Sequence, residues 1–291
     1  VADLAQNLTS GKLYVYKGSK TGSGDWLLLN NTTPAERNNV IGQSALLGAT
    51  SFAGIEDVEI SPLDGKVYLA VKGESTVYRF QDSDPLIGTT VTNFETFVGG
   101  SGQTYDLETK LGNISEAWGS GNDNLAFDNE GNLWVLQDGS KNFLWVVGKN
   151  HSMASPDVRI FMRTPAGSEP TGITFSPDNR FLFMSIQHPA AANAASSQHD
   201  VNGTAVSFAN DAAIVIARNE HWGLIPCQSY IAESAGTLES GYYQSNSNTS
   251  LNIPIETPKK AVHRAANSVQ LNAGFSAKAG STFKAEIGGC Y

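Results

Sequence analysis

A β-hairpin pattern that occurs three times constrains the fold of this chain more than any other feature. Each copy has an alternating strand, a turn of Pro, Asp, Asn or Gly residues, and a more continuously apolar strand. Val58, Leu125 and Ile173 occupy the same place in the copies, which are separated by 125 − 58 = 67 and 173 − 125 = 48 residues. The copies span residues 55–70, 122–136 and 170–186. Hairpins that recur every ~40–50 residues are typical of β-propeller blades.

The strands that complete each blade are expected after these hairpins. They are Ser75–Phe80, Asn142–Val147 and, beyond an Ala/Ser/Asn-rich loop, Ala212–Ala217. The spacing between the first and second hairpins is longer than that between the second and third. This difference is explained if residues 81–121, which are rich in Gly, Asp, Ser and Thr, are an insertion on one face.

Residues 1–48 contain strands at Lys12–Tyr16 and Trp26–Leu29, and a short helix is expected within residues 34–47. We interpret the two strands as the outer strands of a blade whose inner strands lie upstream. The sequence opens with neither an initiator Met nor a signal peptide, which predicts a processed chain or part of a longer one. The fold class predicted is all-β, a partial β-propeller of about four blades followed by a small β domain.

The chain of 291 residues is acidic, with a formal net charge of −9 and a pI near 5.0. This balance disfavours a nucleic-acid or anionic-membrane partner, whose attraction requires a basic patch, and suits a protein that binds cations. No apolar run approaches the roughly 18–20 residues of a membrane-spanning helix, so we expect no transmembrane segment.

The composition changes after Pro226, where a polar stretch rich in Ser, Asn, Gly and Thr begins. We therefore predict two domains, a propeller over residues 1–226 and a small β domain over residues 227–291. Two cysteines, Cys227 and Cys290, are too few for a disulfide framework, but one bridge between them would close the second domain. Such a bridge would contribute about 4 kcal/mol and implies an oxidising, extracytoplasmic setting.

Three acidic residues lie at or just before the first strand of their hairpins: Glu56, Asp123 and Glu169. The innermost strands of a propeller line its central channel, so these carboxylates are expected to converge. Converging carboxylates repel one another unless a cation neutralises them, and oxygen ligands suit Ca²⁺ above all, and Fe³⁺ when further ligands are added. The alternative is that each carboxylate caps a turn or faces solvent.

His188 directly follows an apolar strand and is a candidate partner of such a site, although it also fits a partly buried structural histidine. The other histidines share no spacing. The sequence has none of the signatures of zincins, α/β-hydrolases or nucleotide-binding enzymes. The residues by themselves therefore predict a metal-binding propeller and no specific reaction.

The segment EPTGITFSPDNRFLFMSIQHP, Glu169–Pro189, resembles a segment of PhoX-type alkaline phosphatases in which an acidic residue precedes Thr-Gly, a strand, Ser/Thr-Pro-Asp and Ile-Gln-His-Pro. GIEDVEISPLDGKVYLAV and NDNLAFDNEGNLWVLQDG are similar to two further segments of that family. The resemblance covers about residues 10–220. It implies a six-bladed propeller with a calcium and iron cluster in its channel that hydrolyses small phosphate esters outside the cytoplasm.

The same resemblance assigns roles to individual residues. Glu56 and Glu169 match metal-ligand glutamates of the family, and Asp123 matches the acidic position of its third segment. The chain departs from the family at three points: the cysteine ligand of iron would lie upstream, Gly167 stands where a phosphate-binding arginine is expected, and Ile55 replaces a proline. We therefore expect residues 1–291 alone to be inactive and a full-length protein to hydrolyse phosphomonoesters slowly and only with calcium.

Residues 266–290 are similar to a C-terminal module common on secreted proteins of Bacteroidetes-like bacteria. The similarity implies export and attachment to the cell surface. Three hypotheses follow from the sequence: an exported metal-dependent phosphatase, a non-catalytic calcium-binding propeller that binds a polymer or protein, and a different propeller hydrolase such as a lactonase. Gly167 favours the second hypothesis, and the acidic residues favour the first.

Overall fold

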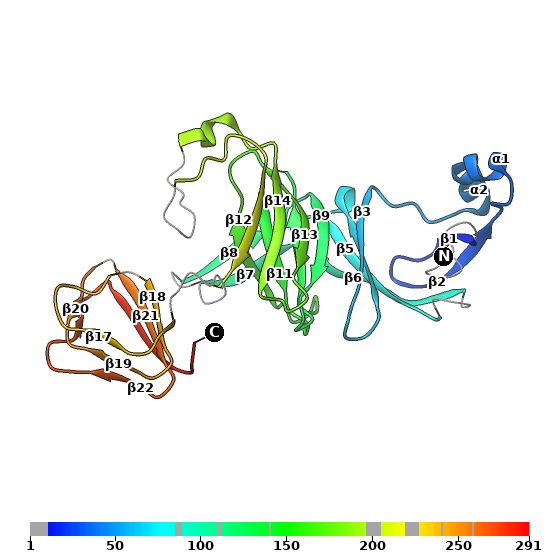
Figure 1. Cartoon of the computed structure of the whole chain (residues 1–291). Helices are drawn as coiled ribbons and strands as arrows, with labels where there is room; N and C mark the ends of the chain where they lie inside the picture. The colour runs from blue at the N-terminus through cyan, green and yellow to red at the C-terminus, as the bar shows by residue number, and fades with distance from the viewer. Residues whose placement is uncertain are drawn as a thin grey trace. The chain divides into compact units, whose positions relative to one another are not determined.

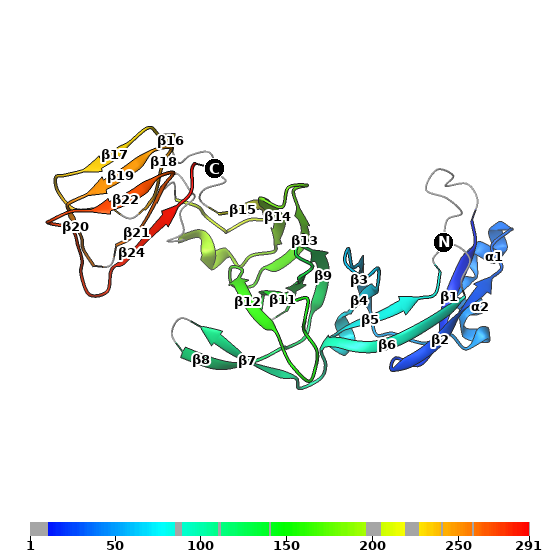
Figure 2. The same ribbon diagram turned by 90° about the horizontal axis from the view of Figure 1, so that it is seen from below.

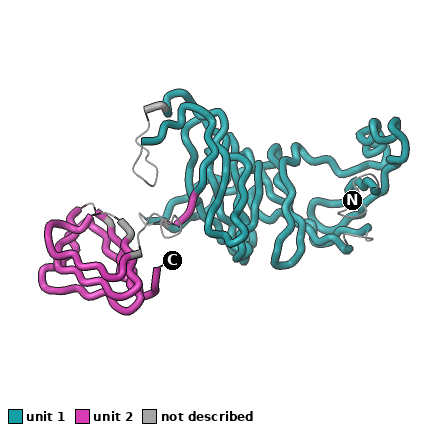
Figure 3. Tube along the Cα trace, in the orientation of Figure 1, with its two compact units in different colours: residues 1–215 teal, residues 216–291 magenta. Residues whose placement is uncertain are grey.

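The chain folds into two compact units, residues 1–215 and 216–291 (Figure 3). The computed structural model describes residues 11–84, 89–109, 112–139, 141–195, 205–218, 227–239, 241–257 and 259–290. The predicted domain boundary after Pro226 falls at the end of residues 219–226, which lie outside the described ranges. Each unit is considered by itself below.

The first unit opens with a six-stranded antiparallel sheet in the order β1-β2-β6-β5-β4-β3 (Figures 1 and 2). Its strands are β1 (Leu13–Gly18), β2 (Gly22–Leu29), β3 (Ile55–Ile60), β4 (Val67–Val71), β5 (Thr76–Asp82) and β6 (Thr90–Gly99). The interpretation of residues 1–48 as the outer strands of a separate blade was wrong. β2 pairs with β6 and so covers the outer edge of the first blade, an edge that would otherwise expose unpaired backbone groups.

Two further sheets follow in the same unit, and they hold the second and third predicted hairpins. The second sheet has the order β12-β11-β10-β9 and the third β13-β14-β15. Their strands are β9 (Asn122–Phe127), β10 (Leu133–Gln137), β11 (Phe143–Val147), β12 (Val158–Arg163), β13 (Glu169–Phe175), β14 (Phe181–Gln187) and β15 (Ala212–Ala217). The first strands of successive hairpins contact one another, β3 with β9 and β9 with β13. The predicted all-β propeller is confirmed, with three blade sheets in the described part of the chain.

The remaining elements of the first unit are short. They are the helices α1 (Pro34–Asn38) and α2 (Val40–Leu47), the 3₁₀ turns η1 (Lys72–Glu74) and η2 (Ala191–Ala195), and the hairpin of β7 (Thr104–Thr109) and β8 (Gly112–Ala117). The two helices confirm the helix expected in residues 34–47. Residues 81–121 are only in part an insertion, because β6 completes the first blade and only the β7–β8 hairpin is additional.

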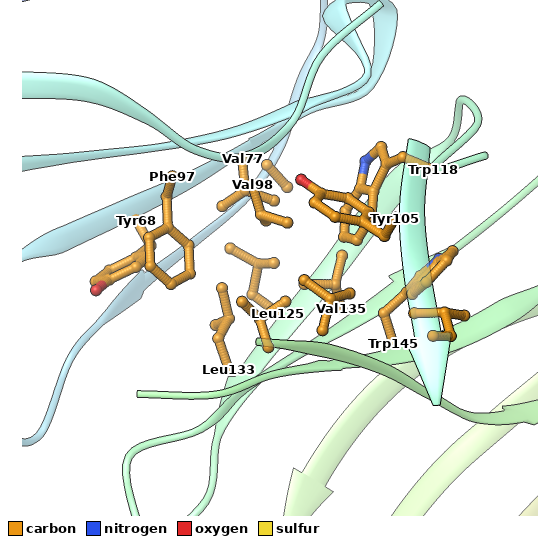
Figure 4. Close-up of a cluster of buried hydrophobic side chains, with 14 residues drawn as sticks. Tyr68, Val77, Phe97, Val98, Tyr105, Trp118, Leu125, Leu133, Val135 and Trp145 are labelled. Atoms are coloured by element: carbon orange, nitrogen blue, oxygen red, sulfur yellow. The ribbon is translucent and has the colours of Figure 1, made fainter. Parts of the chain in front are cut away.

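The largest described core lies between the first and second sheets (Figure 4). Tyr68 of β4 meets Phe127 of β9 edge to face, with ring centroids 5.0 Å apart. Trp118, which follows β8, packs on Trp145 of β11 at 4.9 Å, and both indoles are fully buried. Side chains of this kind stabilise the fold by roughly 1.5–3 kcal/mol each when buried. The β7–β8 insertion is therefore part of the blade interface through Tyr105.

Hydrogen bonds repeat along the same interfaces. Asp57 Oδ2 of β3 accepts a bond from the Leu125 amide of β9 at 2.8 Å. Asn124 Oδ1 of β9 accepts bonds from the Thr171 hydroxyl and the Gly172 amide of β13, each at 2.8 Å. In the first two hairpins, the residue directly before the equivalent position, Val58 or Leu125, thus hydrogen-bonds to the next blade. Asp57 therefore has a structural role at the blade edge.

The second unit is a parallel β-solenoid. Its strands form three sheets: β16 (Cys227–Gln228), β18 (Gly241–Ser245), β21 (Lys260–Ala265) and β24 (Thr282–Ile287); β17 (Ile231–Glu233), β19 (Asn248–Leu251) and β22 (Ser268–Leu271); β20 (Pro254–Ile255) and β23 (Ser276–Ala277). All pairs are parallel, and β18–β21 and β21–β24 partners are 261 − 241 = 20 and 282 − 260 = 22 residues apart. Successive coils therefore stack one on the next. The sequence predicted a β domain here but not its parallel arrangement.

Cys290 is disulfide-bonded, and none of the described cysteines is free. Its predicted partner is Cys227, whose side chain lies outside the described residues. The pairing stays a prediction.

Candidate metal centre

Three carboxylates meet at one end of the inner hairpins. Asp123, Asp138 and Glu169 each offer an oxygen, and these oxygens all lie within 4.8 Å of one another. Asp123 is on β9, Asp138 directly follows β10, and Glu169 is the first residue of β13. Asp123 is buried and the other two are half-buried. Two neighbouring blades thus supply one acidic cluster.

A local irregularity of the second hairpin brings its two aspartates together. The β9–β10 register shifts between Val135 and Gln137, so the strands no longer pair residue by residue at their open end. The Asp138 amide instead donates to the carbonyl of Gly121 at 2.7 Å. Gly121 has φ +94°, and a Cβ there would lie 1.9 Å from the Asp138 carbonyl oxygen. This glycine is therefore needed for Asp138 to sit beside Asp123.

Lys72 bridges the two aspartates from the first blade. It follows β4, and its Nζ lies 2.8 Å from Asp138 Oδ2 and 3.3 Å from Asp123 Oδ2. The Lys72 amide donates to the carbonyl of Gly54, which fixes the start of the turn. Its hydrogen bond with Asp138 and the nearby charge of Asp123 raise the pKa of the Lys72 ammonium above its usual value. Lys72 is therefore charged at neutral pH.

Glu169 is the third carboxylate of the cluster, and its surroundings disfavour its ionised form. Burial, then the charges of Asp138 and Asp123, raise the pKa of its carboxyl, while Lys72 and His188 act in the opposite direction. His188 enters this balance because Glu169 pairs with Gln187 in the β13–β14 ladder, one residue before it. The neighbouring carboxylates thus disfavour the charged form of Glu169 in the absence of a cation.

The residues present fit a hard divalent cation. Three carboxylates and one ammonium carry −3 + 1 = −2 when all are ionised. All the acidic ligands are oxygens, which Ca²⁺ prefers, and Ca²⁺ takes roughly 6–8 of them, so water, backbone or substrate would complete the shell. Beside the cluster, Asn122 is fully buried and neither of its side-chain polar atoms has a partner. A buried amide without partners is costly and consistent with a ligand or water near this end of β9.

The sequence predictions and the structure agree on part of this site. Asp123 and Glu169 lie together, whereas Glu56 is exposed and is not in the acidic group. His188 is exposed, with its amide donating to Asp211 Oδ1 at 2.7 Å.

Sequence reasoning missed Asp138 and Lys72, although a signal for both was present. Lys72, Asp138 and His188 each directly follow the second strand of their hairpin. The same repeat that indicated the entrances of the hairpins also marks these exits. Entrances and exits of a hairpin lie at the same end, so both sets belong to one rim of the blades.

The fold and this cluster define a β-propeller with a candidate metal centre. A family model described as alkaline phosphatase PhoX matches residues 3–190, and the chain belongs to this family. Among solved structures, the chain is similar to Pseudomonas fluorescens PhoX in complex with vanadate, a transition state analogue. Identity is 25% and the TM-score 0.50, over 72% of this chain and 45% of that one. The chain thus spans less than half the length of this relative. No curated protein matches the chain.

Proposed function

We propose that this protein is a metal-dependent phosphoric ester hydrolase that binds phosphomonoesters at a calcium site on the rim of its inner hairpins. The observation that carries the proposal is the group of Asp123, Asp138 and Glu169 in a chain of the PhoX family. A bound cation would neutralise phosphoryl charge and polarise an attacking oxygen. The three carboxylates hold and orient this cation, and Asp123 does so from a buried position.

Lys72 is the basic side chain that we assign to the phosphate. A cation taken up by Asp123 and Asp138 competes with the Lys72 ammonium for the same oxygens and leaves it available for an anion. Lysine binds phosphate as a point charge and lacks the paired contacts of an arginine.

The backbone at Gly167 disfavours the arginine expected from the resemblance. Its φ is +73°, and a Cβ there would lie 3.2 Å from the Cβ of Ala190. A side chain at this position is strained, so substrate recognition differs from the family pattern. This is also the observation that favours the second candidate function, a calcium-binding propeller without catalysis.

Iron is a further proposal. Carboxylates also accept Fe³⁺, but the cysteine ligand expected from the resemblance has no counterpart in Cys290, which is disulfide-bonded. We propose that Ca²⁺ rather than Fe³⁺ is the cation of the cluster described here, because the acidic ligands it offers are all carboxylate oxygens.

Export and surface attachment are proposed for the second unit. They are supported by the similarity of residues 266–290 to a module of secreted proteins and by the disulfide at Cys290, because disulfides persist in oxidising compartments. In the described part of the chain, none of the helices has the length and apolarity needed to cross a membrane.

Calcium and vanadate binding test the proposed function before turnover does. Isothermal titration of the chelator-treated protein should show calcium binding, and vanadate binding only after calcium is added. Asp138→Asn should abolish both, whereas Lys72→Met should keep calcium binding and lose vanadate. Glu130→Gln, an exposed carboxylate in the turn at the opposite end of the hairpin, is the matched control.

Hydrolysis of a chromogenic phosphate ester with and without chelator then separates the two candidate functions. Turnover that disappears with chelator and in Asp138→Asn supports the hydrolase. A protein that binds calcium but neither binds vanadate nor hydrolyses the ester is the binding module. Chelator-insensitive turnover, or the absence of calcium binding, would rule out the site.

A further inference from the structure

The last coil of the solenoid exposes apolar side chains of a kind that the coil before it buries. Leu271 of β22 is 48% exposed, whereas its partner in the preceding coil, Leu251, is fully buried. Ile287 of β24 is 65% exposed, whereas its partner Ala265 is fully buried. In the described part of the chain no further strand pairs with this coil, and β24 is the edge strand of its four-stranded sheet (Figure 2). The last coil is therefore an open end, although terminal repeats of such stacks require a cap.

The backbone of β24 offers hydrogen-bonding groups along this open end. The amides of Thr282 and Gly288 donate to carbonyls of the neighbouring coil at 3.0 and 2.9 Å. Successive peptide groups of a strand point to opposite sides, so the N–H and C=O groups of Phe283, Ala285 and Ile287 point away from the solenoid. The register of β21 and β24 is continuous, and β24 has no proline. Without a proline or a bulge, this edge can pair with another strand.

The side chains of β24 separate into an apolar inner face and a charged outer face. Phe283 packs against the solenoid core, so Ala285 and Ile287, which follow at steps of two residues, face inward as well. Lys284 and Glu286 lie on the outer face, where their charged groups are 2.5 Å apart. The open end thus combines apolar side chains, backbone groups at the free edge and one charge of each sign.

We propose that this open end docks on the open end of a second copy of the chain, with the two β24 strands paired antiparallel about a two-fold axis at Ala285. A two-fold axis makes each strand the antiparallel partner of an identical one. Ala285 then exchanges both backbone hydrogen bonds with Ala285 of the partner subunit, and Phe283 pairs with the partner's Ile287 in the same way. The four-stranded sheet of each copy becomes half of one continuous sheet.

Charge selects this register among those that two-fold symmetry permits. Opposite residues of an antiparallel pair share a face, so the axis must pass through a residue of β24. With the axis at Ala285, Lys284 lies opposite the partner's Glu286 in a non-hydrogen-bonded pair, where side chains come closest. An axis at Lys284 or at Glu286 would instead set two like charges directly opposite each other, which is destabilising. The strand is therefore complementary to itself in one central register.

The other end of the solenoid explains why the contact is two-fold rather than head to tail. Ile231 of β17, in the first coil, is only 2% exposed, so that coil offers no matching apolar end. A further coil of the same chain would begin its next strand at Cys290, 290 − 287 = 3 residues after β24, as β22 begins 268 − 265 = 3 residues after β21. Cys290 is instead disulfide-bonded. The inference is independent of the proposed phosphatase function.

Sedimentation velocity of the complete 291-residue protein over a concentration series tests the proposal. The native protein should reach 2 × 30.9 = 61.8 kDa. Amide hydrogen exchange of residues 282–287 should be slow in the dimer and become fast on dilution. Lys284→Glu places two carboxylates opposite each other and should give a 30.9 kDa monomer. Lys149→Glu makes the same charge change at an exposed position of the first unit and, as the matched control, should remain a dimer.

Ala285→Pro tests the backbone pairing separately from the charges. It removes an N–H that points to the free edge, and proline is tolerated in edge strands where the missing donor would face solvent. The variant should keep its circular dichroism spectrum and be a monomer, whereas Ala285→Ser keeps the N–H and should remain a dimer. If Ala285→Pro loses the native spectrum, Lys284→Glu alone decides.

The remaining outcomes count against the proposal. A native protein that stays monomeric over the whole series overturns it. A dimer that persists in both Lys284→Glu and Ala285→Pro places the contact elsewhere. Masses that keep growing beyond two copies would replace the two-fold contact by a head-to-tail one. Dissociation of Lys149→Glu would show a general effect of charge instead of this register.

Discussion

At the scale of single residues, the acidic cluster lowers the stability of the fold, as is expected of a binding site. Asp123, Asp138 and Glu169 lie within 4.8 Å of one another, and Lys72 balances only part of their charge. Residues chosen for folding alone would not place three carboxylates together. The unfavourable ionisation of Glu169 beside two other carboxylates is the clearest sign that the cluster binds a ligand.

Glu169→Gln should therefore stabilise the protein without metal and remove its response to calcium. The pKa of the Glu169 carboxyl is raised in the folded state, so its ionisation costs stability as the pH rises through the unfolded and then the folded pKa. The variant avoids this cost at neutral pH. Calcium at 100 times its dissociation constant should stabilise the native protein by about 2.7 kcal/mol and the variant by almost nothing.

Thermal unfolding with EDTA and with calcium measures both effects. Glu130→Gln, in the turn at the other end of the hairpin, should behave as the native protein in both conditions. An apo Glu169→Gln protein that unfolds at a lower temperature than the native apo protein would contradict the electrostatic argument.

A buried histidine in the solenoid predicts a pH dependence of the second unit. His263 is fully buried, stacks on Tyr243 at 4.4 Å, and neither of its ring nitrogens has a partner. Burial lowers the pKa of His263 to about 4. The unfolded chain takes up this proton near pH 6.5, so stability is full above that pH, falls as the pH is lowered, and levels off below about 4.

The loss amounts to about 3 kcal/mol, from a difference of roughly 2.5 pH units at 1.36 kcal/mol each. Urea unfolding of the second unit between pH 7 and pH 4 measures it. His263→Phe keeps an aromatic ring in the stack and should flatten the profile. A His263→Phe profile as steep as the native one would assign the effect to other groups.

The sequence located two of the three carboxylates of the cluster, for a physical reason. Asp123 and Glu169 stand at hairpin entrances, where the repeat marks them. Asp138 reaches the cluster only through the shifted β9–β10 register and the left-handed Gly121, and neither is visible in a hydrophobic pattern. Glu56 occupies an entrance too, yet it is exposed and outside the cluster. The repeated hairpin pattern predicts which end of a blade has the functional residues, but not which of their side chains lie close together.

At the scale of elements, local patterns predicted the hairpins and missed the pairing of distant strands. The turn residues and the alternation of each hairpin are local, and all three hairpins form. The pairing of β2 with β6 joins residues about 70 positions apart in sequence, and no local rule specifies it. In the solenoid, a strand alternates in the same way whether its neighbour is parallel or antiparallel, so the parallel coils could not be read from the sequence.

Asn124 of the second blade hydrogen-bonds directly to the third blade. Its Oδ1 accepts bonds from the Thr171 hydroxyl and the Gly172 amide. Asn124→Ala leaves both donors without this acceptor and should cost about 1–3 kcal/mol. Because β13 also carries Glu169, the loosened strand should weaken calcium binding as well.

Chemical denaturation and calcium titration of the variant test this coupling. Asn129→Ala, at an exposed turn position of the same hairpin, is the control and should change neither quantity. If Asn124→Ala loses stability but binds calcium as tightly as the native protein, the blade contact does not position Glu169.

At the scale of the whole molecule, the two units are built on different stabilising principles. The first unit is held by a large core between its first two blade sheets and by an aromatic cluster on the other face of the first sheet. The second has a smaller core around Ile253, Ile255 and Leu238, with a disulfide at Cys290. Small domains with little core depend strongly on such cross-links.

Reduction should therefore destabilise the second unit alone. If Cys227 is the partner of Cys290, the bridge closes a loop of 290 − 227 = 63 residues, and its loss costs about 4 kcal/mol on loop-closure arithmetic. Calorimetry should show two transitions, of which only one moves to lower temperature with a reductant. The transition that responds to reductant should also be the one that responds to acid, because His263 lies within the same loop. Calcium should move only the other transition, which belongs to the unit that holds Glu169. Cys290→Ser without reductant should reproduce the reduced profile, and a reductant that shifts both transitions equally would show that the two units do not unfold separately.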